Sequence, residues 1–202
     1  MTAEITVYTD YVCPYCLLAE KLIREAMNGK DLRIRWRPFE LRPDPVPTLR
    51  VEDEYLPTVW RNSVYPMAER LGVPIVLPRI SPQPRTTKAF EAFAFAEQRG
   101  LGDEFSMRAL RAFFQEERDI GDVDVLASLA QDIGLDGDEV RRALQEGAFA
   151  RTHQEALKHA REEAHVTAVP TIVIGDWRIA GVPRLGPLKD AVAALEGSAA
   201  EA

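Results

Sequence analysis

The sequence predicts an α/β fold in which a small domain of strands and helices is interrupted by a block of helices. Three observations lead to this fold class. Strand-like runs of β-branched and aromatic residues occur near the start, at residues 4–9 and 31–38, and again near the end, at residues 170–180. A helical pattern separates the first two runs. Between about residues 58 and 165 the apolar residues recur at helical spacing instead.

The first 38 residues are predicted to form a strand, a helix and a second strand. Residues 4–9 have the composition of a strand, and residues 15–27 place their apolar side chains at helical spacing. Pro14 suits the first turn of that helix, where its missing N–H is not needed. Residues 31–38 alternate apolar and basic side chains, and Pro38 ends this strand or marks a sheet edge. We expect a right-handed βαβ unit.

The middle of the chain is predicted to be helical. Proline-rich stretches at residues 42–57 and 74–84 predict irregular connections. Residues 58–71 form one predicted helix with a kink at Pro66. Further helices are expected at residues 86–99, 103–117, about 122–133, about 136–145 and 148–164. Aspartates suited to capping their starts are Asp103, Asp122 or Asp124, and Asp136 or Asp138.

The end of the chain returns to strands. Residues 170–180 are predicted to form a hairpin that turns at Gly175 and Asp176, and residues 186–196 a closing amphipathic helix.

Composition narrows the class of partner. The 202 residues are 46% hydrophobic and 28% charged with a net charge of −7, the balance of an ordinary globular protein. No apolar run approaches the ~18 residues of a membrane helix, and no basic stretch would follow a phosphate backbone. We therefore expect neither membrane nor nucleic acid as a partner. The first ten residues lack signal-peptide features, which favours a cytoplasmic location if the chain is complete; a trimmed mature form would look similar.

The two cysteines are the strongest chemical signal. They form Cys13-Pro14-Tyr15-Cys16 at the predicted start of the first helix. A disulfide scaffold would spread more cysteines along the chain, and a disulfide closing so small a loop stabilises little. At a helix start, unpaired backbone N–H groups and the helix dipole favour a thiolate. We expect Cys13 to be the exposed attacking thiol and Cys16 the buried resolving thiol.

A zinc site is the main alternative for a Cys-x-x-Cys pair. Structural zinc needs about four ligands. The three histidines, His153, His159 and His165, are spaced by six residues and do not share a helix face. They are expected to lie on solvated helix faces, with His165 the best candidate for an exception.

Two carboxylates lie near the motif in sequence. Asp10, three residues before Cys13, is either a group that tunes the thiols and handles protons or a loop residue that points to solvent. Glu40, just past the second strand, is either a buried acid that takes the proton of Cys16 or a surface glutamate. The solvent-facing alternative is favoured for both.

The chain resembles the DsbA family of the thioredoxin superfamily, and within it the FrnE-like branch. The resemblance covers nearly the whole chain. It rests on Asp10-Tyr-Val-Cys-Pro-Tyr-Cys16, Trp36-Arg-Pro-Phe-Glu-Leu41, Asp119-Ile-Gly-Asp-Val-Asp-Val-Leu126, Ala168-Val-Pro-Thr-Ile-Val-Ile174 and Ile179-Ala-Gly181.

The resemblance implies a thioredoxin-like fold with a large all-helical insertion. Residues 1–48 and 149–202 would form the thioredoxin-like domain and residues 49–148 the insertion. Val169-Pro170 would be a cis peptide packed against the cysteines, and the Val169 backbone would pair with an extended substrate segment. The chain has no second cysteine pair of the kind that some FrnE-like proteins carry.

Three functions follow from these observations. The first is a thiol–disulfide oxidoreductase or isomerase that acts on protein or peptide disulfides, with Pro14, Tyr15, Val169, Pro170 and Asp10 supporting the two cysteines. It needs no cofactor beyond its own redox-active disulfide, and glutathione or a thioredoxin-type protein would be its electron partner. The second is a glutathione-dependent enzyme of the kappa transferase or hydroxychromene-carboxylate isomerase type, which usually has serine at the first cysteine position. The third is a non-catalytic protein that binds unfolded clients.

Overall fold

The computed structural model describes residues 3–200. Its strands are β1 (Ala3–Thr9), β2 (Leu32–Pro38), β3 (Thr171–Ile174) and β4 (Trp177–Ala180). Its helices are α1 (Pro14–Met27), α2 (Tyr55–Val59), α3 (Tyr65–Leu71), α4 (Thr87–Glu97), α5 (Gly102–Glu116), α6 (Val123–Asp132), α7 (Gly137–Gln145), α8 (Ala150–Lys158) and α9 (Leu185–Ala200). Two π-helical turns, η1 (Trp60–Val64) and η2 (His159–Glu163), continue α2 and α8.

The strands form one four-stranded sheet in the order β2-β1-β3-β4. β1 and β2 are parallel, with Ile5 opposite Ile34, and α1 connects them as the sequence predicts. β3 pairs antiparallel to β1 and to β4. The hairpin between β3 and β4 turns at Gly175, whose positive φ of 55° is a conformation that glycine adopts without strain. The mixed α/β fold class predicted from the sequence is confirmed.

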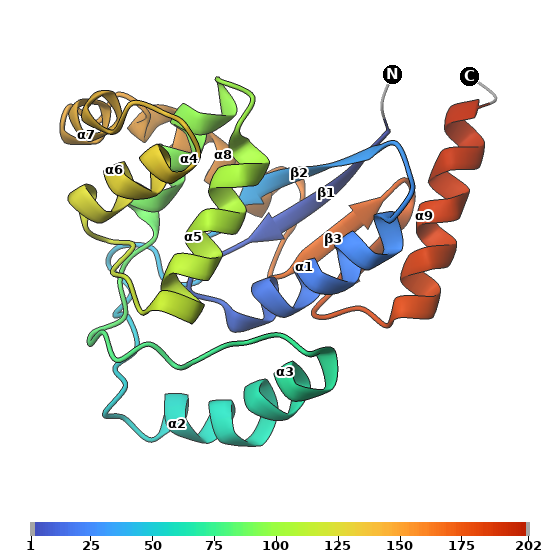
Figure 1. The fold of residues 1–202 in the computed structure, drawn as a ribbon, viewed down its shortest axis with the longest axis horizontal. Coiled ribbons are helices and arrows are strands. Elements are labelled where there is room, and N and C mark those ends of the chain that lie inside the picture. Colours follow the sequence, from blue (N-terminus) through green and yellow to red (C-terminus); the bar gives the residue numbers. More distant parts are fainter. Residues whose placement is uncertain (1–2, 201–202) are drawn as a thin grey trace.

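Helices from distant parts of the chain surround this sheet (Figure 1). α1 and α9 lie side by side, and α9 also contacts β1 and β3. α5 and α8 contact β2, while α6 and α7 pack on α4 farther from the sheet. α2 and α3 form a separate layer beside α1. The domain boundaries at residues 48/49 and 148/149 stay a prediction, because one continuous buried core joins the helical block to the sheet.

Helix α4 is the element whose burial differs most from its sequence pattern. The pattern places apolar side chains on one side, yet every residue from Ala89 to Ala96 is buried, including Glu91. α5, α6, α7 and α8 all contact α4. A helix enclosed in this way buries its whole circumference rather than one stripe.

The helix at residues 58–71 begins earlier than predicted, at Tyr55, and is not a simple kinked helix. Its middle turn, η1, has π-helical hydrogen bonding, and α3 follows with Pro66 near its start. A proline cannot donate to the carbonyl four residues back and its ring crowds that carbonyl, so a wider turn before Pro66 removes the conflict.

The capping predictions are part right and part wrong. Asp122 and Asp136 cap α6 and α7, and each carboxylate accepts two backbone N–H bonds of the first turn. Asp103 does not cap α5, which begins at Gly102 after Leu101. Instead its carboxylate accepts hydrogen bonds from Trp36 Nε1 at 2.7 Å and from Arg24 at 2.5 Å. These partners lie far away in the sequence, so the local pattern could not identify them.

Candidate active site

The Cys-x-x-Cys motif lies where β1 passes into α1. Cys13 is the N-cap residue, Pro14 is the first helical residue, and the Cys16 N–H donates to the Cys13 carbonyl at 3.0 Å. The Cys13 N–H donates to the Asp10 carbonyl, also at 3.0 Å, which closes the loop before the helix. Both sulfurs are therefore held at the first turn, where unpaired N–H groups favour an anion.

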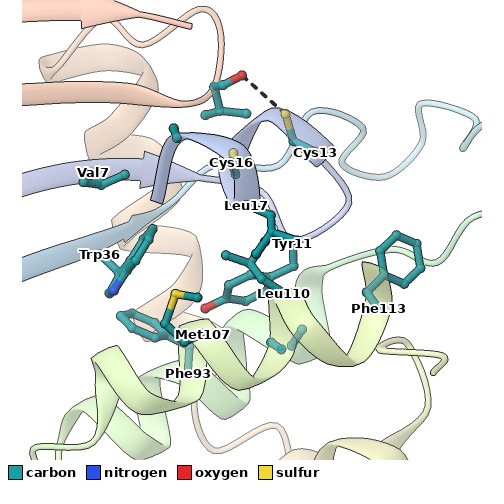
Figure 2. Close-up of a cluster of buried hydrophobic side chains, with 14 of the residues drawn as sticks. Val7, Tyr11, Cys13, Cys16, Leu17, Trp36, Phe93, Met107, Leu110 and Phe113 are labelled. Atoms are coloured by element: carbon teal, nitrogen blue, oxygen red, sulfur yellow. Dashed lines mark hydrogen bonds between the residues drawn. The ribbon is translucent and has the colours of Figure 1, made fainter. Parts of the chain in front are cut away.

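Cys13 is less accessible than the sequence suggested. We expected an exposed attacking thiol, but Cys13 is 4% exposed and Cys16 is 1% exposed. Neither is in a disulfide. Tyr11, from the preceding loop, points into the core beside Leu110 (Figure 2). The motif therefore packs directly against buried side chains of the core.

The loop before β3 covers the Cys13 sulfur. Its thiol donates to the Val169 carbonyl at 3.4 Å, the dashed line in Figure 2. The Val169–Pro170 peptide bond is cis, as the family resemblance implied. The chain thus brings together two segments that lie 156 residues apart in sequence, and it places a backbone edge next to Cys13.

Cys16 lies behind Cys13 in the core. Burial raises the pKa of Cys16 well above its ordinary value, and the neighbouring Cys13 sulfur raises it further. The Thr9 hydroxyl and the Asp10 backbone N–H have the opposite effect on this pKa. A thiol in this setting stays protonated until a reaction at Cys13 changes its surroundings.

Asp10 is buried rather than solvent-facing. It is 1% exposed, and its Oδ2 accepts the Leu41 N–H at 2.7 Å, while Oδ1 is buried and makes no hydrogen bond. Burial raises the pKa of Asp10 to about 6, and the charge of Glu40 also raises it. The Leu41 N–H and the Thr86 hydroxyl lower it without offsetting the burial. The prediction of a solvated loop aspartate is therefore wrong.

Glu40 is also buried, at 3% exposure, although a surface position was favoured. Its Oε1 lies 2.5 Å from His153 Nε2. His153 is 3% exposed and stacks on Phe90, with ring centroids 5.4 Å apart. His165, the best candidate for an exception, is exposed, and the expectation of a solvated helix face is wrong for His153 instead. Position along a helix could not show which histidine faces a buried carboxylate, because that depends on how α8 packs against the end of β2.

Tyr15 connects the motif to the layer of α2 and α3. Its hydroxyl donates to Ser63 Oγ at 2.7 Å, across 48 residues. Ser63 lies in η1, so this bond joins the start of α1 to the π-helical turn.

A pocket of about 220 Å³ opens over Cys13. The described residues that line it include no acidic, basic or histidine side chain. They are Val12, Cys13, Pro14, Tyr15, Leu41, Leu49, Tyr55, Leu56, Val59, Trp60, Gln83, Phe114 and Val169. Leu41 and Tyr55 are well exposed, at 43% and 58%, and form an apolar rim. Most of this wall comes from the helical block, and no local sequence pattern indicated that this block would face the cysteines.

Within residues 3–200, no three histidine, cysteine, aspartate or glutamate side chains gather in a way that could hold a metal ion.

A family model described as a DSBA-like thioredoxin domain matches residues 4–193. The chain belongs to the DSBA-like thioredoxin family. This DSBA-like chain is 48% identical over 182 residues to the uncharacterized protein YwbO of Bacillus subtilis. The matched region covers 90% of this chain and 91% of YwbO. The FrnE-like branch stays a prediction.

Solved structures share the fold at low identity. The cytosolic disulfide reductase DsbM from Pseudomonas aeruginosa matches 98% of this chain and 100% of its own, with a TM-score of 0.72 and 21% identity. A 2-hydroxychromene-2-carboxylate isomerase matches 98% of both chains, with a TM-score of 0.77 and 19% identity. The fold of this DSBA-like protein is thus common to thiol–disulfide oxidoreductases and to an isomerase.

None of the described helices, which lie within residues 3–200, combines the length and the apolar character needed to cross a membrane.

Proposed function

We propose that this chain is a thiol–disulfide oxidoreductase or isomerase that acts on protein or peptide disulfides through Cys13 and Cys16. The observation that carries the proposal is the position of the Cys13 sulfur. It lies at a helix N-terminus, against the Val169 carbonyl and next to cis-Pro170, with Cys16 directly behind it. The family to which the chain belongs supports the same chemistry.

The reaction proceeds in two exchanges. The Cys13 thiolate attacks one sulfur of a substrate disulfide, the substrate S–S bond breaks, and its other sulfur leaves as a thiolate that takes up a proton. Cys16 then loses its proton and attacks the Cys13 sulfur of the mixed disulfide. This step releases the second substrate thiol and leaves a Cys13–Cys16 disulfide, so two electrons have passed to the substrate. Glutathione or a thioredoxin-type reductant would return the pair to the dithiol.

The surroundings of Cys13 fit a polypeptide substrate. An extended segment can pair with the backbone edge at Val169 without its sequence being read. The uncharged pocket and the apolar rim of Leu41 and Tyr55 accept side chains that flank a disulfide in an unfolded chain. We propose a cytoplasmic location, as for the cytosolic reductase DsbM, and there the glutathione pool favours reduction or isomerisation.

A redox titration tests the dithiol couple. The purified protein is equilibrated in buffers with different ratios of reduced to oxidised glutathione and then alkylated. Mass spectrometry gives the number of thiols that were alkylated. We expect one reversible two-electron transition that forms an internal Cys13–Cys16 disulfide. The Cys16→Ser variant should accumulate a mixed disulfide with a cystine-containing peptide, and Cys13→Ser should form none. Failure to form an internal disulfide at any poise would contradict the proposal.

A glutathione-dependent transferase or isomerase is the second candidate. The fold it shares with a 2-hydroxychromene-2-carboxylate isomerase and with DsbM solved with GSH favours it. No acidic or basic side chain among the described residues lines the Cys13 pocket, whereas Arg42 and Arg85 line the adjoining pocket that reaches Asp10. Calorimetric titration of reduced glutathione into the Cys13→Ser, Cys16→Ser variant separates the two. Tight binding without disulfide exchange in the wild type would favour the second candidate.

A further inference from the structure

Gln83 is a buried polar residue of the pocket wall near the cysteine motif. It belongs to the loop between α3 and α4, is 7% exposed, and its backbone N–H donates to the Leu49 carbonyl at 2.7 Å. It lines the pocket over Cys13 and also a smaller neighbouring pocket of about 50 Å³ that reaches Asp10. The two pockets share Val12, Leu41, Leu49, Leu56 and Gln83.

The amide group of Gln83 is fixed in one orientation. Its Nε2 donates to the Ile80 carbonyl at 2.6 Å and to the Pro78 carbonyl at 3.2 Å. Both partners are carbonyl oxygens, which only accept, so the nitrogen and not the oxygen must face them. The side-chain oxygen therefore points away from the loop in a direction set by two hydrogen bonds.

That oxygen takes no part in holding the side chain to the loop. Within residues 3–200, both side-chain hydrogen bonds of Gln83 are made by Nε2 and neither uses Oε1. It is also not one of the fully buried polar atoms that lack a partner, which are Thr9 Oγ1, Asp10 Oδ1 and His153 Nδ1. Since Nε2 faces the loop and Gln83 lines both pockets, an Oε1 turned away from the loop can face the pockets.

The other polar side chains of the Cys13 pocket are less suited to hold a substrate in place. The Tyr15 hydroxyl donates its proton to Ser63, and Tyr55 is an exposed side chain on the rim. Cys13 itself reacts. Gln83 thus supplies a fixed side-chain acceptor in a pocket whose walls are mainly apolar.

We propose that Gln83 is a positioning residue that accepts a hydrogen bond from a backbone N–H of the polypeptide lying across Cys13. Val169 holds one side of the segment through its backbone, and Gln83 holds the other through Oε1. The bond aligns the substrate sulfur with Cys13 without reading side-chain identity. This inference rests on the proposed function and deepens it by naming the substrate class as one that presents a peptide N–H next to its disulfide.

A cycle that combines a protein variant with substrate methylation tests the assignment. The substrate is a short cystine-linked peptide, in unmethylated form and in forms with one N-methylated amide at a time beside the reactive cysteine. Reduction is measured as kcat and KM for the wild type, Gln83→Met and Gln115→Met. Gln115 is the matched control, because its Nε2 donates to the Pro74 carbonyl of the same loop at 2.8 Å while the residue lies outside both pockets.

We expect one amide whose methylation lowers kcat/KM of the wild type about 3- to 10-fold, mainly through KM, which is the effect of one neutral hydrogen bond. In Gln83→Met that methylation penalty should fall below about 2-fold. In Gln115→Met it should stay at the wild-type size. If the substitution only loosens the loop, kcat/KM falls by the same factor for the methylated and the unmethylated peptide, and the methylation penalty does not change.

The failing outcomes are distinct. Equal penalties in the wild type and Gln83→Met at every amide would overturn the role of Gln83 and leave the dithiol function standing. Wild-type reduction of bis(2-hydroxyethyl) disulfide without reduction of the peptide would overturn both the peptide substrate and the Gln83 assignment. Reduction of neither would remove the dithiol function and the inference that rests on it.

Discussion

Asp10 shows how burial changes the chemistry of one side chain. Its carboxyl group is enclosed beside the cysteine loop, receives one backbone N–H from Leu41, and lies near the charge of Glu40. Burial disfavours the charged form, so the pKa of Asp10 rises to about 6. At neutral pH the Asp10 carboxylate is therefore ionised at the expense of folding free energy.

The pH dependence of stability tests this description of Asp10. A carboxyl whose pKa is 3.8 in the unfolded chain and about 6 in the folded one binds more protons when folded, so stability falls as pH rises from about 4 to 6. The full effect is about 3 kcal/mol. We expect Asp10→Asn to be more stable than the wild type by about 1–3 kcal/mol at pH 7 and by almost nothing at pH 4. Urea unfolding at intermediate pH values measures the gap.

The matched control is Asp176→Asn, at an exposed turn residue. Its stability difference from the wild type should stay small and nearly constant over the same pH range. A gap between Asp10→Asn and the wild type that does not change with pH would show that Asp10 titrates as an ordinary aspartate.

At the scale of elements, the contact between α1 and η1 decides access to Cys13. The Tyr15 hydroxyl binds Ser63, and neighbouring residues of the same layer, Leu56, Val59 and Trp60, form part of the pocket wall. The dipeptide between the cysteines therefore also fastens the helical layer over them. Because Cys13 is only 4% exposed, movement of this layer should change its accessibility.

Removing the Tyr15 hydroxyl should loosen the contact between α1 and η1 that limits access to Cys13. We expect Tyr15→Phe to lose about 0.5–1.5 kcal/mol of stability and to raise the alkylation rate of Cys13 by iodoacetamide about 2- to 5-fold. Ser63→Ala should have the same two effects, and the double variant should add little, since both remove one bond. Alkylation at fixed pH, followed by mass spectrometry, gives the rate.

Tyr65→Phe serves as the comparison, because the Tyr65 hydroxyl in the same helical layer accepts the Leu77 N–H and does not line the pocket. It should change stability without changing alkylation of Cys13. Equal alkylation rates in the wild type, Tyr15→Phe and Ser63→Ala would mean that this bond does not limit access.

At the scale of the whole molecule, Glu40 and His153 join the early and late parts of the chain. Glu40 follows β2, whereas His153 lies on α8, 113 residues later. Both side chains are almost fully buried, and Arg161 adds a hydrogen bond to the Glu40 carbonyl at 3.1 Å. The pair holds α8 against the end of β2, close to the aspartate beside the motif.

Breaking this pair should destabilise the fold strongly. His153→Leu leaves the Glu40 carboxyl buried without its partner, and we expect a loss of about 2–5 kcal/mol in urea unfolding. The double variant Glu40→Leu, His153→Leu should recover part of that loss, because no unpaired polar group remains. His159→Leu, at a half-buried histidine of the same helical segment, should lose less than about 1 kcal/mol. Equal losses for His153→Leu and His159→Leu would show that the buried pair is not important.

Local pattern was sufficient for most of the elements. Alternation identified the edge strand β2, helical spacing and Pro14 identified α1, and aspartates at Asp122 and Asp136 marked two helix starts. These signals act over a few residues, so they can be read before the fold is known. Pro66 also signalled an irregular helix, although the form it takes, a π-helical turn, depends on packing.

Long-range contacts decided the environment of each candidate residue. The sequence identified Cys13 and Cys16, and the family resemblance implied the cis Val169–Pro170 bond. The sequence nevertheless favoured solvent for Asp10 and Glu40 and exposure for Cys13, and all three are buried. It also gave no reason to choose His153 over His165, or to single out Gln83 in a proline-rich loop. Spacing along a chain fixes which side chains share a local face. Burial, partners and pKa depend on segments up to 156 residues away, and only the packed tertiary structure brings those together.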